Sequence, residues 1–226
     1  MITGAIINAV AILVGGGIGL LLKNRVSKNF SEGVMRALGL CVCIIGVQGA
    51  LDGDFMLMTI SLALGALCGE ILHIDRRLND FGMVLQNKFG KGGDGSTFAR
   101  GFVSATLLFC VGAMAIVGSI ESGLTGEHSI VITKSVIDAF SSVVLAATFG
   151  VGVLFSAVPV LLYQGGIEFF ASRLQDVFTA GLVTQLSATG GVMIFAIGIN
   201  MVFGEKIKVA NLLPGFIFAA IGHLLL

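Results

Sequence analysis

The chain has 226 residues, of which 56% are hydrophobic and only 12% are charged, and its mean hydropathy is +1.02. Thirteen basic and thirteen acidic residues balance each other, so the composition offers no basic surface for nucleic acid. Several apolar runs approach the ~20 residues that a membrane-spanning helix needs. We therefore expect an all-α polytopic membrane protein whose residues 1–226 form a single transmembrane domain.

The apolar runs predict about eight transmembrane helices in chain order. The first follows no positively charged segment, which indicates a retained span rather than a secretory signal peptide. The run from 130 to 170 is twice as long as one crossing needs, and Pro159 interrupts it, so we expect two spans joined by a turn near Ser156. The eight predicted spans are 4–22, 34–51, 55–73, 101–120, 131–153, 154–172, 181–203 and 207–225.

Basic residues predict the orientation, because Lys and Arg accumulate in cytoplasmic loops. If eight spans start outside, only Lys134 and Arg173 fall on the outer side, and we expect both termini there. The other basic residues fall in cytoplasmic connections: Lys23, Arg25, Lys28, Arg36, Arg76, Arg77, Lys88, Lys91, Arg100, Lys206 and Lys208.

The longest connection, 76–100, is expected to hold a cytoplasmic amphipathic segment and a linker. Apolar residues recur at helical spacing from Leu78 to Phe89, which suits a short helix on the membrane face. The linker "GKGGDGST" resembles a phosphate-binding loop only superficially, because that motif needs Lys directly before Ser or Thr and a preceding strand.

An internal similarity relates spans one to three to spans six to eight. Five crossings separate span one from span six, so the two copies would have opposite orientations, as in the inverted repeats of many secondary transporters. We therefore expect a first repeat at 1–75, a central helix pair at 101–153 and a second repeat at 154–226. Aligned positions are Gly46 with Gly198, Gln48 with Asn200, Glu70 with His223, and Gly16-Gly17 with Gly165-Gly166.

Thirty-three glycines indicate close helix packing. Gly15 and Gly19, and likewise Gly65 and Gly69, have the small-xxx-small spacing that lets helix backbones approach. Packing within the chain and a homodimer face both remain compatible with this spacing.

Lys134 and Asp138 lie in the first turns of the fifth predicted span. They are four residues apart and so share one helix face. A charged side chain at the bilayer centre costs ~2.5–3.5 kcal/mol even on lenient scales, so such groups face a partner or a cavity. Two interpretations stay open: a salt bridge that anchors the helix, or a cation or proton site at Asp138 with Lys134 as its counter-charge.

Three neutral side chains complete the candidate ion- or substrate-binding set. Gln164 precedes a Gly pair, Asn211 precedes Pro214, and Asn200 lies in a "GIN" stretch. Each could supply a ligand or make an interhelical hydrogen bond. No arrangement of catalytic or metal-binding residues appears in the spans, so we expect no enzymatic activity, metal or cofactor.

The strings "FCVGAMAIVGSIESGLTGEHS", "TKSVIDAFSS", "FSAVPVLLYQGG", "SATGG", "GIN" and "VANLLP" make the chain resemble the domain-of-unknown-function family numbered 554, the YdfK/YqgA-like bacterial inner-membrane proteins. The resemblance implies location in the bacterial cytoplasmic membrane and leaves the activity open. The family commonly has an acidic residue where this chain has Gln185, so an indispensable charge at that position is not implied.

These observations predict a secondary transporter or facilitator of a small solute or inorganic ion, whose partners would be the lipid bilayer and that solute. A non-transporting scaffold or regulatory protein acting through the cytoplasmic loop is the first alternative, and an ion channel is the second.

Overall fold

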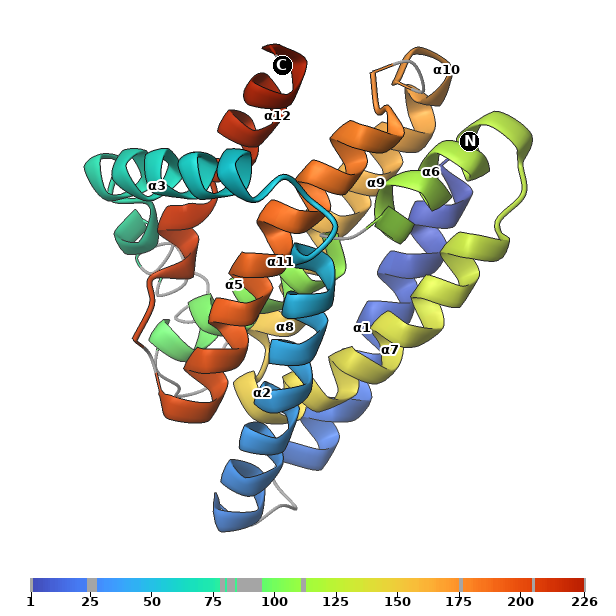
Figure 1. Ribbon diagram of the computed structural model, residues 1–226. Helices are drawn as coiled ribbons and strands as arrows, with labels where there is room; N and C mark the ends of the chain where they lie inside the picture. Colours follow the sequence, from blue (N-terminus) through green and yellow to red (C-terminus); the bar gives the residue numbers. More distant parts are fainter. Residues whose placement is uncertain are drawn as a thin grey trace. The chain divides into compact units, whose positions relative to one another are not determined.

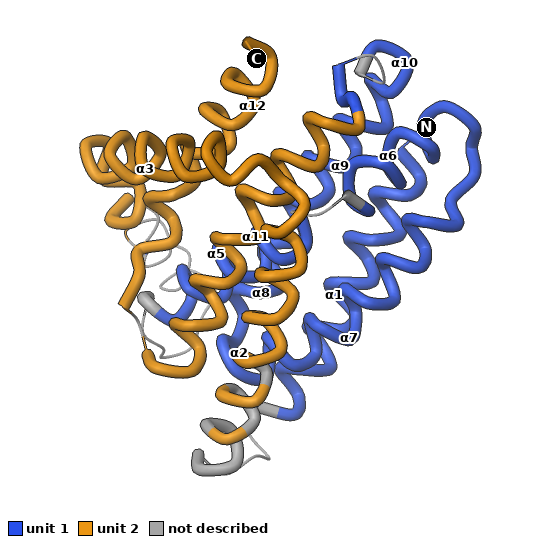
Figure 2. Tube along the Cα trace, viewed as in Figure 1, with its two compact units in different colours: residues 1–26, 81–179 blue, residues 27–80, 180–226 orange. Residues whose placement is uncertain are grey.

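The computed structural model describes residues 2–23, 28–77, 80, 84, 95–110, 113–174, 177–204 and 206–225. Throughout these ranges the regular secondary structure is helical, as the composition predicts. Helices from distant parts of the sequence group into two compact units (Figure 2). Unit 1 comprises Met1–Val26 and Phe81–Thr179, and unit 2 comprises Ser27–Asp80 and Ala180–Leu226.

The α-helices of the two units are labelled in Figure 1. Unit 1 contains α1 (Thr3–Lys23), α5 (Gly95–Cys110), α6 (Ala113–Thr125), α7 (Ser129–Phe149), α8 (Gly152–Phe155), α9 (Ala157–Phe169) and α10 (Ala171–Leu174). Unit 2 contains α2 (Lys28–Ala50), α3 (Phe55–Ile71), α11 (Ala180–Phe203), the 3-10 helix η1 (Val209–Leu212) and α12 (Gly215–Leu225).

Four helical segments of the described chain are long and apolar enough to cross a membrane: Thr3–Leu22, Ser129–Phe149, Gly152–Phe169 and Ala180–Phe203. Two bent helix pairs add up to two more spans if each pair counts once. The pairs are Gly39–Ala50 with Phe55–Ile71, bent by 120°, and Thr97–Cys110 with Met114–Thr125, bent by 59°. By length and composition the described helices thus give four to six spans, fewer than the eight expected.

Two predicted boundaries need correction. The turn expected near Ser156 lies at Gly150, which ends α7 with φ of +81°, a conformation that glycine adopts without the steric cost of a Cβ atom. The span expected at 207–225 is divided into η1 and α12, because Pro214 lacks the backbone N–H that a continuous helix would use. Of the predicted amphipathic segment, Leu78, Phe81, Leu85 and Phe89 lie outside the described residues.

Within unit 1, α1 packs along α7 in the same direction (Figure 1). Gly4 faces Val131, and further along both helices Gly19 lies against Val143, so the contacting residues advance together. A Cβ atom on Gly15 would overlap the carbonyl group of Ala139. The glycine spacing recognised in the sequence therefore serves a close crossing inside the chain.

Helix α9 runs antiparallel to α1 in the same unit. Gly165, near the end of α9, lies beside Ala5 at the start of α1. Leu154 of α8, at the other end of the same apolar segment, lies beside Gly16. Helices α1, α7 and α9 thus hold the middle of unit 1 together.

Unit 2 is built on a second glycine-lined crossing, between the antiparallel helices α2 and α11. Gly39 lies against Gly198, and Gly46 lies against Gly191. Helices α3 and α12 pack in the same manner, with Gly65 against Gly215. Asp54 begins α3 as its N-cap, because its side chain accepts a hydrogen bond from the Leu57 N–H at 2.7 Å.

Candidate functional site

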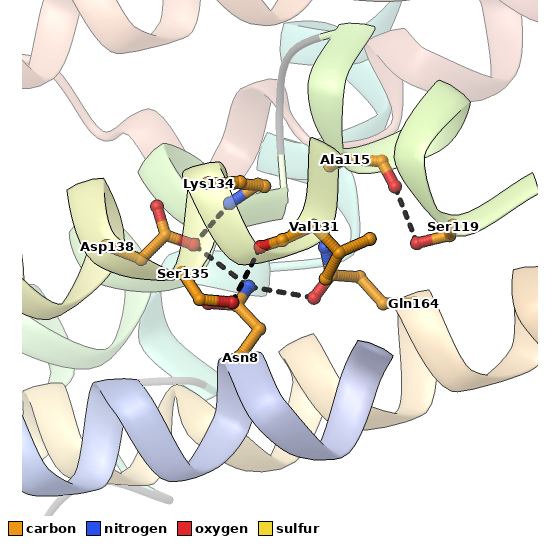
Figure 3. Close-up of polar contacts among 8 residues, drawn as sticks. All are labelled: Asn8, Ala115, Ser119, Val131, Lys134, Ser135, Asp138 and Gln164. Carbon is orange, nitrogen blue, oxygen red and sulfur yellow. Dashed lines mark hydrogen bonds and ion pairs between the residues drawn. The ribbon is translucent and has the colours of Figure 1, made fainter. Parts of the chain in front are cut away.

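The charged pair of α7 is buried inside unit 1 (Figure 3). Lys134 and Asp138 are 6% and 5% exposed, and the Lys134 Nζ atom forms an ion pair with Asp138 Oδ2. Helix α7 begins at Ser129, so at 1.5 Å per residue Asp138 lies ~14 Å along its axis. The carboxylate is therefore well inside a helix long enough to cross the hydrocarbon core, which is ~30 Å thick.

Two amides from other helices extend this pair into a network. Asn8 of α1 donates from Nδ2 to Asp138 Oδ2 at 3.0 Å and to Gln164 Oε1 of α9 at 2.8 Å. Figure 3 shows Asn8 between the charged pair and Gln164. Asn8 and Gln164 are both fully buried. We call these four residues, Asn8, Lys134, Asp138 and Gln164, the Asp138 network.

Close helix packing makes this network geometrically possible. The backbone approach at Gly15 brings α1 near enough to α7 for a short Asn side chain to reach Asp138. Gly165, the neighbour of Gln164, lies beside Ala5 of α1 at ordinary packing distance. Three helices distant in sequence thereby place their polar side chains together.

The Asp138 network has hydrogen-bonding capacity that the described residues leave unused. Asn8 Oδ1 and Gln164 Nε2 are buried and have no hydrogen-bond partner among the described residues. Asn8 Oδ1 is an acceptor and Gln164 Nε2 is a donor, so the two atoms can hold one further group of each kind. The available oxygens of Asp138, Asn8 and Gln164 are hard donors suited to a proton or a small cation.

Serine side chains near the network satisfy their own helix backbone instead. Ser135 donates to the Val131 carbonyl and Ser119 donates to the Ala115 carbonyl, both at 2.7 Å (Figure 3). Such intrahelical bonds leave the serine oxygens as secondary acceptors.

The remaining two predicted site residues lie in unit 2. Asn200 accepts the N–H groups of Lys206 and Ile207 at 2.9 and 3.0 Å and donates to the Ile207 carbonyl at 2.7 Å. Asn211 accepts the Asp75 N–H at 2.8 Å and donates to Glu70 Oε2 at 2.5 Å. Asn200 and Asn211 thus bind groups of unit 2, whereas Lys134, Asp138 and Gln164 share one network in unit 1.

Asn8 is the member of the network absent from the predicted set. Asn8 is the only amide side chain in the apolar run "TGAIINAVAILVGGGIGLLLK". Polar side chains within membrane helices usually form interhelical hydrogen bonds, so the sequence alone could have identified it as a candidate. Its partners, 130 and 156 residues away, could not have been identified without the helix packing.

The described helices, four of them able to cross a membrane and one carrying a buried ion pair, define an all-helical membrane protein. The chain belongs to the family described as "Protein of unknown function (DUF554)", whose profile matches residues 3–224. It is 32% identical to the "Uncharacterized membrane protein YdfK" of Bacillus subtilis (strain 168), over 95% of this chain and 92% of that protein. It is 30% identical to the "Uncharacterized protein YqgA" of Escherichia coli (strain K12), over 97% of this chain and 95% of that protein. No solved structure matches.

Proposed function

We propose that this protein is a secondary transporter or facilitator that moves a small solute or inorganic ion across the bacterial cytoplasmic membrane. Asp138 would bind the coupling proton or cation, and Lys134 would balance its charge in the empty state. The observation that carries the proposal is the Asp138 network itself. Asp138 is 5% exposed on an apolar helix, yet its carboxylate is contacted by Lys134, one helical turn away, and by Asn8, 130 residues away in the sequence.

The mechanism follows from competition for one carboxylate. In the empty state the Lys134 ammonium and the Asn8 amide both bind Asp138 Oδ2. A proton or cation arriving at this carboxylate removes the attraction that holds Lys134, so the buried ammonium is left without its partner. An uncompensated buried charge costs several kcal/mol, which is enough to shift a helix arrangement between two states. Asn8 would bind the ion through its unpaired Oδ1 atom, whereas the unpaired Gln164 Nε2 group is a hydrogen-bond donor and would hold an oxygen of an accompanying solute or water.

The glycine contacts support an inverted repeat. The alignment that places Gly46 on Gly198 also places Gly39 on Gly191, and these four glycines contact reciprocally, Gly46 with Gly191 and Gly39 with Gly198. Any antiparallel pair gives reciprocal contacts, but glycine at all four positions is what two related copies would require. Inverted repeats commonly frame the substrate sites of secondary transporters.

The direction of the helices supports more than six crossings. Helices α1 and α7 run parallel, so an odd number of crossings must separate them if both span the membrane. If α2 with α3 is counted as one broken span, and α5 with α6 as another, two crossings lie between α1 and α7. An even number of crossings would make α1 and α7 antiparallel. A reversal between α2 and α3, as in the eight-span arrangement, gives three. Both termini would then lie outside, which reporter fusions to the C-terminus can test.

A second candidate function has its own supporting observation. A membrane scaffold acting through the loop 76–100 needs only that Lys134 and Asp138 neutralise each other, and they do form an ion pair. In that case the pair would be structural, and replacing both partners by apolar residues would leave the function intact.

The decisive experiment uses purified protein in proteoliposomes with a pH-sensitive dye inside. Gradients of Na⁺, K⁺ and H⁺ are imposed in turn, and dye response is recorded across a range of pH. We expect ion- or proton-dependent flux that Asp138→Asn abolishes, while Asp52→Asn, which neutralises an exposed carboxylate of unit 2, does not. Flux that is unchanged in Asp138→Asn at every pH would disprove the proposal.

A further inference from the structure

A second buried polar group lies at the N-terminal end of α1 within unit 1. It consists of Glu168 on α9, Ser122 on α6 and His128 directly before α7, and we call it the Glu168 cluster. An ideal Cβ atom on Gly4 would contact both the Glu168 Oε1 atom and the Ser122 Oγ atom, which places these side chains together. Neither the family description nor the Asp138 network accounts for it.

The two oxygens of Glu168 have different environments. Oε1 accepts the Ala5 N–H at 2.9 Å, in the first turn of α1, where the helix dipole stabilises a negative charge. Oε2 is buried and has no hydrogen-bond partner among the described residues. Glu168 as a whole is 2% exposed. Capping α1 explains Oε1 but leaves Oε2 without a function.

Ser122 and His128 connect this carboxyl group toward the exposed loop before α7. The Ser122 hydroxyl lies beside the Glu168 carboxylate and is 2.7 Å from His128 Nδ1. Ser122 is buried, His128 is half-buried, and the adjacent Glu127 is exposed. The three side chains thus form a continuous path from a solvent-facing loop to a buried acid.

We propose that Glu168 is a proton-binding site that exchanges its proton with the loop 126–129 through Ser122 and His128. The imidazole takes a proton from water at Nε2 and gives its Nδ1 proton to Ser122 Oγ. The serine passes its own hydroxyl proton to the Glu168 carboxylate, whose Oε1 atom lies near Ser122 Oγ beside Gly4. An imidazolium and a carboxylate thereby become a neutral imidazole and a carboxylic acid, and the reverse transfers restore them.

A proton fits this site better than a metal ion does. Metal ions need several ligands, and no group of three His, Cys, Asp or Glu side chains suited to a metal occurs in the described part of the chain. The other titratable side chains on elements packed against α9 include Cys110 on α5, Glu121 on α6 and Arg173 on α10. His128 is joined to the cluster by the 2.7 Å hydrogen bond between its Nδ1 atom and Ser122 Oγ.

The Glu168 cluster is aligned with the Asp138 network. Glu168 is one helical turn after Gln164 on α9, and Gly4 is one turn before Asn8 on α1, a separation of ~6 Å along each helix. Proton binding at Glu168 would therefore change the charge one helical turn from the Asp138 network and so act on that network electrostatically; Asn8 donates both of its hydrogen bonds there and passes no proton on. This last step rests on the proposed transport function, whereas proton binding at Glu168 does not.

The test uses dicyclohexylcarbodiimide, an apolar reagent that modifies protonated carboxyl groups in lipid. The full-length protein in nanodiscs is treated over a series of pH values, and modified peptides are quantified by mass spectrometry. We expect Glu168 to be labelled at acidic pH and protected as pH rises. Ser122→Ala and His128→Gln should extend labelling upward by about one pH unit, a roughly tenfold change in proton concentration, because each removes a group that stabilises the carboxylate.

Matched variants keep the test specific. Ser119→Ala removes a buried serine of the same helix that bonds its own backbone, and Ser122→Thr retains the hydroxyl; both should label as the unchanged protein does. No labelling of Glu168 at any pH, or identical profiles in Ser122→Ala and the unchanged protein, would overturn the proposal. Protection by Na⁺ at fixed pH would also overturn it, since a cation would then occupy the site.

The two proposals can fail separately. If Glu168 is still labelled in Asp138→Asn while flux is insensitive to that change, the proton site stands and the transport proposal fails. If flux depends on Asp138 but Glu168 is never labelled, the proton site fails and transport stands.

Discussion

The amide side chains of the two units have partners in different environments: in unit 1 Asn8 binds a buried carboxylate, whereas in unit 2 the partners are backbone groups or, for Asn211, the exposed carboxylate of Glu70. In unit 1, Asn8 links Asp138 and Gln164 by side-chain bonds across three helices. In unit 2, Asn200 binds backbone groups at 206 and 207, and Gln185 accepts the backbone N–H of Asp54 at 2.8 Å. An amide that binds backbone fixes a turn. An amide that binds an ionised side chain helps to keep a charge where lipid would otherwise exclude it.

The lysine ion pairs of the two units also differ, in how deeply they are buried. In unit 1 the side chains of Lys134 and Asp138 are each 7% exposed, whereas in unit 2 those of Lys208 and Glu70 are 61% and 59% exposed. Both pairs join a lysine ammonium to a carboxylate, so the difference in burial should decide how much each pair contributes to stability. Substitutions can test this contrast directly, because Lys134 and Lys208 can be removed separately.

The largest expected effect is that of Lys134→Met. The substitution leaves Asp138 charged and buried, which should lower the free energy of unfolding by ~3–5 kcal/mol. Titration with a denaturing detergent, followed by circular dichroism, measures this loss. The double variant Lys134→Met/Asp138→Leu removes both charges and should recover most of the stability. A double variant as unstable as Lys134→Met alone would show that the charge pair is not the reason for the loss.

A smaller effect is expected for Asn8→Ala. It removes hydrogen bonds to a carboxylate and to a buried amide, and bonds to charged groups contribute ~1.5–3 kcal/mol each. Asn200→Ala is the matched change in unit 2. Both should lower stability in the same detergent titration, but only Asn8→Ala should also change the pH dependence of flux in proteoliposomes. Equal pH dependence in both variants would remove the functional distinction between the units.

Some residues of this comparison could be predicted from the sequence, and others could not. Lys134 and Asp138 were predicted to share a helix face because their four-residue spacing is a local property. Glu168 is not among the predicted site residues. Its hydrogen bond from Ala5, 163 residues away, depends on which helices pack together, and the sequence alone does not show this. The helical class was predictable from composition, whereas the break at Pro214 and the turn at Gly150 shortened the expected spans.

Glycine positions give a third test, and here the two units should behave alike. In unit 2, a Cβ atom on Gly46 would lie 2.7 Å from the Gly191 carbonyl oxygen, closer than real contacts allow. Gly46→Ala should therefore lower stability by ~1–3 kcal/mol, the usual cost of overpacking, and Gly15→Ala should do the same in unit 1. Gly17→Ala is the control, because nothing lies within 4 Å of its Cβ position. Destabilisation by Gly17→Ala of the same size would contradict close packing as the cause.

Lys208→Ala should have the smallest effect. Its ion pair with Glu70, at 3.1 Å, is more than half exposed, and such pairs contribute little to stability because water and salt screen them. Glu70 also keeps its bond from Asn211, so loss of the lysine leaves no buried charge without a partner. Any measured loss should shrink further at high salt, while the effect of Lys134→Met should persist, since a buried pair is little screened. If instead Lys208→Ala were as damaging as Lys134→Met, burial would not be what separates the two pairs, and the special status of Asp138 would lose its physical basis.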